Sequence, residues 1–332
     1  MRPYHELTYR GRALRLRRMA FAALAHYDLQ VGRVRLLSND LNGIFRVDTT
    51  AGEKYVLRVC LPGTVGHTLE EIRSEMMWLE ALHNDANLNA PQPVATRDGR
   101  YVTTVEVDGV PEPRHCVVFT WAPGPDLADR LSPNNVFMMG ELAARLHSQA
   151  ESFEPPEGFW IRSKNKVFPY GEGVVIFDAE QKPLFPPERR SVYQQAVDRI
   201  QGALDRLYNR GEPPRVIHND LHQWNVKAYH SRLFAIDFED LMWGHPVQDI
   251  AVTLYYLVGY DNYLQLRDTF RHGYTMHRDW PEAYEGEIDT FIAGRGLTLA
   301  NFVLQDPDVK YRAMAPEYVE RIEGRLVTLL KL

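Results

Sequence analysis

The sequence predicts an α+β fold of two domains, with antiparallel strands in the N-terminal part and helices in the C-terminal part. First, a chain of 332 residues exceeds the usual size of one hydrophobic core. Second, short apolar runs separated by turn residues fill residues 34–60, as is typical of a strand meander. Third, apolar residues recur at helical spacing later in the chain. The helices expected there cover residues 134–148, 192–208, 250–258 and 261–332.

The N-terminal part begins with an expected helix over residues 12–27. Leu16, Ala20 and Ala23 fall at helical spacing there, and the arginines among them are expected to form a solvated face. Alternating apolar runs, turn residues and a second helical period follow this segment. The strands and the helix expected there cover residues 34–37, 44–47, 54–60, 69–82 and 114–121.

A cluster of breaker residues, Ala122-Pro-Gly-Pro125, marks the expected domain boundary. Residues 1–121 are therefore predicted to form the first domain and residues 122–332 the second. Residues 151–190 contain six prolines and no sustained period. Because a structureless stretch of this length inside a compact domain is usually functional, we interpret it as an insertion on the substrate side.

Charge and cysteine content limit the possible partners. The net charge of −6 gives no basic field of the kind that attracts nucleic acid, so no nucleic-acid partner is expected. No apolar run has the length of a bilayer span, so no membrane partner is expected either. Cys60 and Cys116 lie within apolar, strand-like runs. This predicts buried free thiols in a reducing compartment, the cytoplasm.

Oxygen-bearing side chains gather at the ends of two short apolar runs, residues 215–217 and 233–236. Asp220 and Asn225 follow the first run, and Asp237 follows the second. Magnesium takes one or two oxygen ligands from a protein and the rest from phosphate and water, so Asn225 and Asp237 would suffice to hold it. Asp220 would then be left to accept a hydroxyl proton. The plainer alternative is that all three are turn or cap residues.

The stretch His218-Asn-Asp-Leu-His-Gln-Trp-Asn225 resembles the HxDxxxxN catalytic loop of the aminoglycoside phosphotransferase, choline kinase and homoserine kinase group. Ile236-Asp-Phe-Glu239 resembles the metal motif of the same group. The resemblance implies a bilobal, protein-kinase-like fold, with a small N-terminal nucleotide-binding lobe and a larger, mainly helical catalytic lobe. It also implies ATP and Mg²⁺ as cofactors, with Asp220 as the catalytic base and Asn225 and Asp237 as metal ligands. His218 is expected to hold the loop.

The resemblance also indicates which residues bind the nucleotide. Arg58 falls where the family has a phosphate-contacting lysine, and Glu75 is expected to pair with it, although a solvent-exposed glutamate is the alternative. The backbone of residues 119–121 would face the adenine, unless this stretch is only a linker; its residues are Phe119, Thr120 and Trp121. A turn that could cover the phosphates carries Ser38, Asn42 and Gly43, but a plain hairpin turn needs no ligand.

Only eleven residues separate Asp237 from Asp249, which leaves no room for the activation segment on which protein kinases dock a peptide. A small hydroxyl acceptor is therefore expected, such as an aminoglycoside, an amino alcohol or a homoserine-like compound. Residues 279–289 contain five acids and no base, and they could attract a cationic acceptor or form a solvated loop. Asp249 is expected to cap the next helix, and the resemblance implies that it also braces the catalytic loop. His147 is expected to be a packing or surface residue.

The predicted function is ATP-dependent transfer of the γ-phosphate to a small-molecule hydroxyl. Two alternatives remain open from the sequence. One is a Ser/Thr protein kinase of the bacterial stress-response type, which has a similar catalytic loop. The other is a catalytically weak ATP-binding scaffold, which the departure from lysine at Arg58 allows.

Overall fold

The computed structural model describes residues 3–39, 41–62, 67–84, 88–171, 173–305 and 309–331. The chain forms two compact units that share the sequence in alternating segments. Unit 1 comprises Met1–Pro125, Phe153–Ile161 and Lys227–Glu239. Unit 2 comprises Asp126–Ser152, Arg162–Val226 and Asp240–Leu332. Unit 1 holds an antiparallel sheet and unit 2 is mainly helical, which confirms the α+β prediction.

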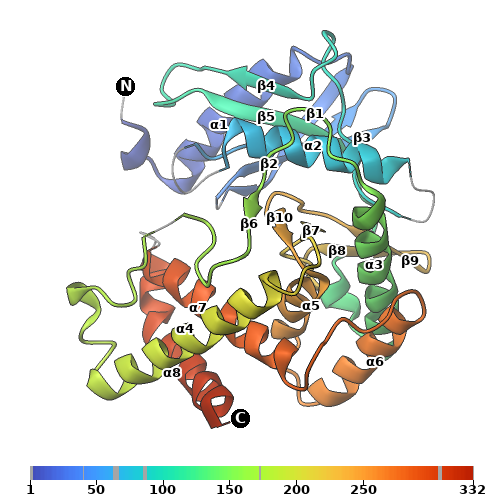
Figure 1. The fold of residues 1–332 in the computed structure, drawn as a ribbon. Helices are drawn as coiled ribbons and strands as arrows, with labels where there is room; N and C mark the ends of the chain where they lie inside the picture. The colour runs from blue at the N-terminus through green and yellow to red at the C-terminus, as the bar shows by residue number, and fades with distance from the viewer. Residues whose placement is uncertain are drawn as a thin grey trace. The chain divides into compact units, whose positions relative to one another are not determined.

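Unit 1 is built on a five-stranded antiparallel sheet of order β1-β2-β3-β5-β4 in the described residues (Figure 1). Helix α1 packs its apolar stripe against this sheet, and Leu16, Met19 and Ala23 are buried in the shared core. The strands are β1 (Val31–Asn39), β2 (Gly43–Thr49), β3 (Lys54–Val59), β4 (Val102–Val105) and β5 (Arg114–Thr120). The helices are η1 (Tyr4–Glu6), α1 (Tyr9–Leu24) and α2 (Leu69–His83).

Local sequence accounts for the starts of α1 and α2 in unit 1. Thr8 caps α1 by accepting a hydrogen bond from the N–H of Gly11. Thr68 and Glu71 form a reciprocal capping box at the start of α2. The apolar residues of α2 then form a buried face that carries Trp78 and Glu75 on neighbouring turns. The predicted burial of both cysteines, as free thiols, is confirmed.

A hairpin from late in the sequence, β8 (Val226–Tyr229) with β9 (Arg232–Ala235), carries most of the third segment of unit 1. The N–H of Ala228 donates to the carbonyl of Pro125 at 3.0 Å. The backbones approach so closely that a Cβ at Gly124 would lie 2.2 Å from the Ala228 carbonyl oxygen, and Gly124 has a φ of +96°. Glycine is therefore required at position 124. The Ala122-Pro-Gly-Pro125 cluster forms a turn and also allows the close contact with the backbone of Ala228.

Unit 2 consists of packed helices with a small sheet of order β6-β10-β7 in the described part of the chain (Figure 1). Its strands are β6 (Arg162–Ser163), β7 (Arg215–Ile217) and β10 (Met242–Gly244). Its first helical elements are η2 (Leu127–Arg130), α3 (Pro133–Ser152), η3 (Ala179–Gln181) and α4 (Pro187–Tyr208). The later helices are α5 (Pro246–Tyr255), α6 (Tyr263–Thr275), α7 (Glu287–Gln305) and α8 (Val309–Lys331).

Two sequence expectations about unit 2 need correction. Helix α4 begins at Pro187, five residues before the expected start, because proline at the first helical position is compatible with the helix. Helix α5 begins at Pro246 behind His245, and a capping box joins His245 to Gln248. Asp249 therefore lies inside the first turn and is not the cap.

Candidate active site

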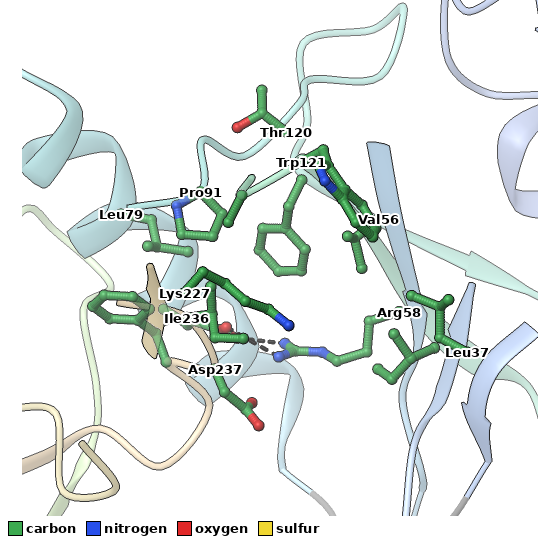
Figure 2. A pocket seen from close by; sticks show the side chains of 15 residues that line it. Leu37, Val56, Arg58, Leu79, Pro91, Thr120, Trp121, Lys227, Ile236 and Asp237 are labelled. Carbon is green, nitrogen blue, oxygen red and sulfur yellow. Dashed lines mark hydrogen bonds and ion pairs between the residues drawn. The ribbon is translucent and has the colours of Figure 1, made fainter. Parts of the chain in front are cut away.

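A cavity of about 290 Å³ lies within unit 1, at the lower end of the range for small-molecule pockets (Figure 2). Strands β2, β3 and β5, helix α2 and the β8–β9 hairpin contribute its walls. The lining residues are Leu37, Ile44, Val56, Arg58, Glu75, Leu79, Pro91, Phe119, Thr120, Trp121, Ala122, Lys227, Ile236, Asp237 and Phe238. The cavity is mostly apolar, with its charged groups supplied by β3, α2 and the hairpin segment.

Arg58 is the centre of a buried ion cluster in this cavity. Its Nη1 donates to Glu75 Oε1 at 3.0 Å, and its Nη2 donates to the other oxygen of the same carboxylate. Nη1 also lies 3.3 Å from Oε2 of Glu239. Burial alone would lower the pKa of the Arg58 guanidinium, but the charges of the two glutamates help to raise it well above its ordinary value. The expected Arg58–Glu75 pair is therefore present, with Glu239 as a further carboxylate partner.

The expected phosphate-covering turn is tied to this cluster. Asn42 donates through Nδ2 to Glu239 Oε2 at 2.6 Å, and its Oδ1 accepts from the N–H of Leu61 at 2.8 Å. Gly43 is buried, and a Cβ there would meet the Leu16 side chain at 3.2 Å. Ser38 is half-buried on β1, and position 40 lies outside the described residues. Contact of this turn with phosphate remains a prediction.

The residues expected to face the adenine, 119–121, line the cavity, and some of their backbone N–H groups already form hydrogen bonds. The N–H of Thr120 donates to the carbonyl of Gln92 at 2.9 Å, and the N–H of Trp121 donates to the carbonyl of Lys54 at 3.3 Å. Phe119 is nearly buried and lies beneath the Arg58 guanidinium, 5.4 Å from the ring centroid. The following residue, Ala122, also lines the cavity, and contact of this stretch with adenine remains a prediction.

Asp237 follows β9 and lines the same cavity. Its φ of 65° lies in the left-handed region, which aspartate and asparagine adopt more readily than most residues. The next residue, Phe238, is buried and packs edge-on against Trp78 of α2, with ring centroids 5.7 Å apart. This aromatic contact anchors the segment that presents the exposed Asp237.

In unit 2, Asp249 holds the loop that follows β7. Its Oδ2 accepts from the N–H of His218 at 3.1 Å, and its Oδ1 accepts from the N–H of Asn219 at 2.7 Å. Asn219 has a φ of 64°, so the chain turns sharply between the two bonds. The Nδ1 of His218, which is fully buried, accepts from the N–H of Asp220 at 3.3 Å. Asp249 thus braces the loop as expected, and the position of His218 suits a holding role.

His147 on α3 extends this network and is not a surface residue. Its Nε2 lies 3.1 Å from Asp249 Oδ2, and its Nδ1 lies 3.0 Å from the hydroxyl of Tyr274. Burial would raise the pKa of the Asp249 carboxyl, but the hydrogen bond and charge of His147 outweigh burial and hold that pKa below its ordinary value. Asp249 therefore stays ionised and able to accept all three bonds.

Among the described residues, the side chains of Arg295, Asn225 and His222 contact the carboxylate of Asp220. Arg295 donates through Nη2 to Oδ1, Asn225 donates through Nδ2 to Oδ2 at 2.8 Å, and His222 Nε2 lies 3.3 Å from Oδ2. Burial would raise the pKa of the Asp220 carboxyl, but the charge of Arg295 and the His222 hydrogen bond outweigh burial and lower it. The carboxylate is therefore ionised at neutral pH, as a proton acceptor must be.

The segment 151–190 also reaches this loop. Lys164 donates through Nζ to Asn219 Oδ1, and Asn219 donates through Nδ2 to the hydroxyl of Tyr170 at 3.1 Å. Burial, together with the charge of Arg295, lowers the pKa of Lys164 to about 7. The long proline-containing stretch thus places a lysine and a tyrosine beside the residue that precedes Asp220.

Sequence reasoning missed Arg295 and Lys227 as site residues, and it quoted Glu239 only as part of a motif. Arg295 is the one charge in the apolar run 291–300 of α7, and an isolated charge of this kind is rarely buried without a partner. That pattern could have drawn attention to it. Lys227 follows Asn225 by two positions, close enough to have been considered with the catalytic loop.

The acidic stretch 279–289 is engaged in bonds within unit 2. Glu287 is fully buried and pairs with Arg210, and Asp289 Oδ1 lies 2.6 Å from Arg267 Nη1. Glu282 accepts hydrogen bonds from the N–H groups of Gly286 and Ile288 at 3.2 and 3.3 Å. Three of its five acids therefore have structural partners, which weakens the idea that this stretch attracts a cationic acceptor.

The fold resembles that of solved small-molecule kinases. A structure described as the microcompartment-associated aminopropanol kinase superposes with a TM-score of 0.77 at 24% identity, covering 95% of this chain and 97% of that one. An amicoumacin kinase in complex with AMP-PNP, Ca²⁺ and Ami gives a TM-score of 0.74 at 19% identity, covering 96% of each chain. In sequence, the amicoumacin kinase of Bacillus subtilis (strain 168) is 24% identical over 239 residues, which is 72% of this chain and 67% of that protein.

The antiparallel sheet of unit 1, the helical unit 2 and the likeness to these solved structures indicate the fold of a small-molecule kinase. Residues 33–285 match the model of the phosphotransferase enzyme family, and the chain therefore belongs to that family. It is a small-molecule phosphotransferase, which confirms the predicted enzyme class. None of the helices in the described ranges has both the length and the apolar composition that a bilayer span requires.

Proposed function

We propose that the protein transfers the γ-phosphate of ATP to a hydroxyl group of a small molecule, with Asp220 as the proton acceptor. The main support is the environment of the Asp220 carboxylate. Arg295 and Asn225 hold it ionised and oriented at the end of a loop that Asp249 braces. A positioned carboxylate of this kind can orient the attacking hydroxyl and accept its proton.

The side chains proposed as magnesium ligands fit a hard cation. The amide nitrogen of Asn225 donates to Asp220, which leaves its carbonyl oxygen as the ligand atom. Asp237 supplies an exposed carboxylate. Among the described residues, no group of three or more histidine, cysteine, aspartate or glutamate side chains could hold a metal alone. This suits Mg²⁺, which takes further ligands from phosphate and water and, when bound, offsets phosphate charge.

The cavity of unit 1 is the proposed nucleotide site. Its apolar wall, with Val56, Leu79 and Phe119, suits a flat nucleobase. The charged groups on β3 and the hairpin segment suit a phosphate chain. The chain's own contribution there is to bind and orient the nucleotide, since phosphoryl transfer depends mainly on positioning and charge stabilisation.

The acceptor is proposed to be a small alcohol such as an aminoglycoside, an amino alcohol or a homoserine-like compound. The names of related proteins support a small acceptor: one is an aminopropanol kinase and two are amicoumacin kinases. The short connection between Asp237 and Asp249 also favours a small acceptor, because it has no room for a peptide-docking segment.

A coupled ADP-release screen tests this proposal. The panel would contain aminoglycosides, choline-like amines, homoserine and sugars, each with Mg·ATP, together with a parallel assay of phosphate transfer to protein. We expect at least one small alcohol to raise ADP release above the acceptor-free rate, and Asp237→Asn to abolish that turnover while the protein stays folded. Transfer to protein alone, or turnover in Asp237→Asn equal to that of the wild type, would contradict the proposal.

A further inference from the structure

Lys227 of β8 lines the cavity of unit 1 and is half-buried there. Figure 2 shows its side chain extending into the cavity, and in this view the ammonium group points toward the Arg58 guanidinium. Among the described residues that line this cavity, Arg58 and Lys227 carry the positive charge. The nucleotide-binding role that the sequence assigned to Arg58 therefore has a second candidate.

The bonds of Arg58 favour that second candidate. Both terminal nitrogens of Arg58 donate to Glu75, and one of them also faces Glu239 at 3.3 Å. One positive charge thus faces two carboxylates, and the three groups together carry a net charge of −1. Such a cluster repels a phosphate chain unless further positive charge is present. Lys227 is the lining residue that brings a second positive charge to the cavity, where Asp237 adds a further carboxylate.

The burial and flexibility of the two cationic side chains also favour Lys227 as the residue that contacts phosphate. Arg58 is 4% exposed, and its two terminal nitrogens face the carboxylates of Glu75 and Glu239, so the side chain is held within the protein. The ammonium of Lys227 is a compact charge on a flexible stem, which can follow a phosphate group as the nucleotide enters. Arg58 is therefore suited to holding α2 and the segment of Glu239, and Lys227 to contacting the ligand.

We propose that Lys227 supplies the positive charge that contacts the nucleotide phosphates, and that Arg58 mainly positions Glu75 and Glu239. This inference rests on the proposed function, because it assigns a role within the nucleotide site. It differs from the sequence expectation, in which Arg58 takes the place of the family's phosphate-contacting lysine.

Binding measurements on Lys227→Met test the inference without requiring an acceptor. Calorimetric titrations would compare ATP, ADP and adenosine on the wild-type protein and the variant. Loss of one charge-assisted phosphate contact should weaken ATP and ADP binding by about 10- to 100-fold, while adenosine affinity changes by less than about twofold. Lys227→Arg keeps the charge and should recover most of the lost affinity.

Lys54→Met is the matched control, because Lys54 lies on β3 of the same unit, is exposed and does not line the cavity. It should bind all three ligands as the wild type does. ATP affinity in Lys227→Met within about twofold of the wild type would overturn the inference, as would an equal loss for adenosine and ATP. A wild-type protein that binds neither ATP nor adenosine would overturn the proposed function, and the inference with it.

Discussion

Arg295 of α7 donates a hydrogen bond to the carboxylate of Asp220, a residue 75 positions earlier in the chain. The same nitrogen of Arg295 also lies 3.0 Å from the hydroxyl of Tyr256. Arg295 and Asp220 both have mostly buried side chains, so water screens their interaction only weakly. Helix α7 therefore helps to keep the Asp220 carboxylate ionised and to orient it, although α7 lies far from the catalytic loop in the sequence.

Replacing Arg295 with methionine should change the pH dependence of the reaction. Arg295 lowers the pKa of the Asp220 carboxyl, so its loss raises that pKa and shifts the acidic limb of the kcat/KM profile to higher pH. At neutral pH, kcat/KM should fall by about 10- to 100-fold, because a charge-assisted hydrogen bond to the base is lost. The measurement is a set of pH profiles for the two proteins with an accepted alcohol.

Two further variants separate this effect from general damage to the fold. Arg295→Lys keeps a positive charge near Asp220 and should move the acidic limb back toward that of the wild type. Arg206→Met removes an exposed arginine of α4 and should leave the profile unchanged. If Arg295→Met lost activity but kept the acidic limb of the wild type, Arg295 would not act through the Asp220 charge.

Asp249→Asn should destabilise the protein by about 2–4 kcal/mol, because an amide cannot accept all the bonds that the buried carboxylate accepts. Urea unfolding at pH 7 measures this loss. The pKa of Asp249 is depressed in the folded protein, so its stabilisation is complete above the ordinary value of 3.8. It is lost as the pH falls through the lower folded value. The gap between the two proteins should therefore narrow only below about pH 4.

Asp268→Asn serves as the control for this measurement, because Asp268 is exposed on α6. It should stay within about 0.5 kcal/mol of the wild type. A cost for Asp249→Asn as small as that of Asp268→Asn would show that Asp249 does not brace the catalytic loop.

Gly124→Ala should cost about 3–5 kcal/mol, because the new Cβ meets the Ala228 carbonyl oxygen at 2.2 Å in addition to the strain of the positive φ. Gly211 offers a matched comparison: its φ is +89°, and a Cβ there meets nothing within 4 Å. Gly211→Ala should therefore cost only about 1–2 kcal/mol. Equal losses for the two variants in urea unfolding would refute the close contact that holds the hairpin of Lys227 and Asp237.

Much of the fold could be predicted from local patterns. Three elements formed nearly where the sequence predicted them, because their apolar residues alternate or recur with a clear period. They are the strands predicted at 54–60 and 215–217 and the helix predicted at 69–82. Elements that depend on partners were harder to predict. Strands β6 and β10 have two and three residues, and they exist because they pair with each other and β10 pairs with β7.

In the candidate site, too, local patterns predicted some residues, whereas others depend on contacts between distant parts of the chain. His218, Asp220 and Asn225 lie on one short loop, so their spacing alone indicated that they act together. Arg295 joins them only through the packing of α7 against α5, and no local pattern specifies that contact. Glu239 reaches Arg58 because the β8–β9 hairpin belongs to unit 1, which the single predicted boundary near residue 121 did not anticipate. The convergence of Asp237 with Asp220 and Asn225 remains a prediction.

The turnover of Asp220→Asn tests the proposed mechanism most directly. The substitution keeps the shape of the side chain and removes its ability to accept the hydroxyl proton. Single-turnover assays with Mg·ATP and an accepted alcohol should show a rate about 10²- to 10⁴-fold below that of the wild type, with ATP affinity unchanged. A rate within about tenfold of the wild type would show that Asp220 is not the catalytic base.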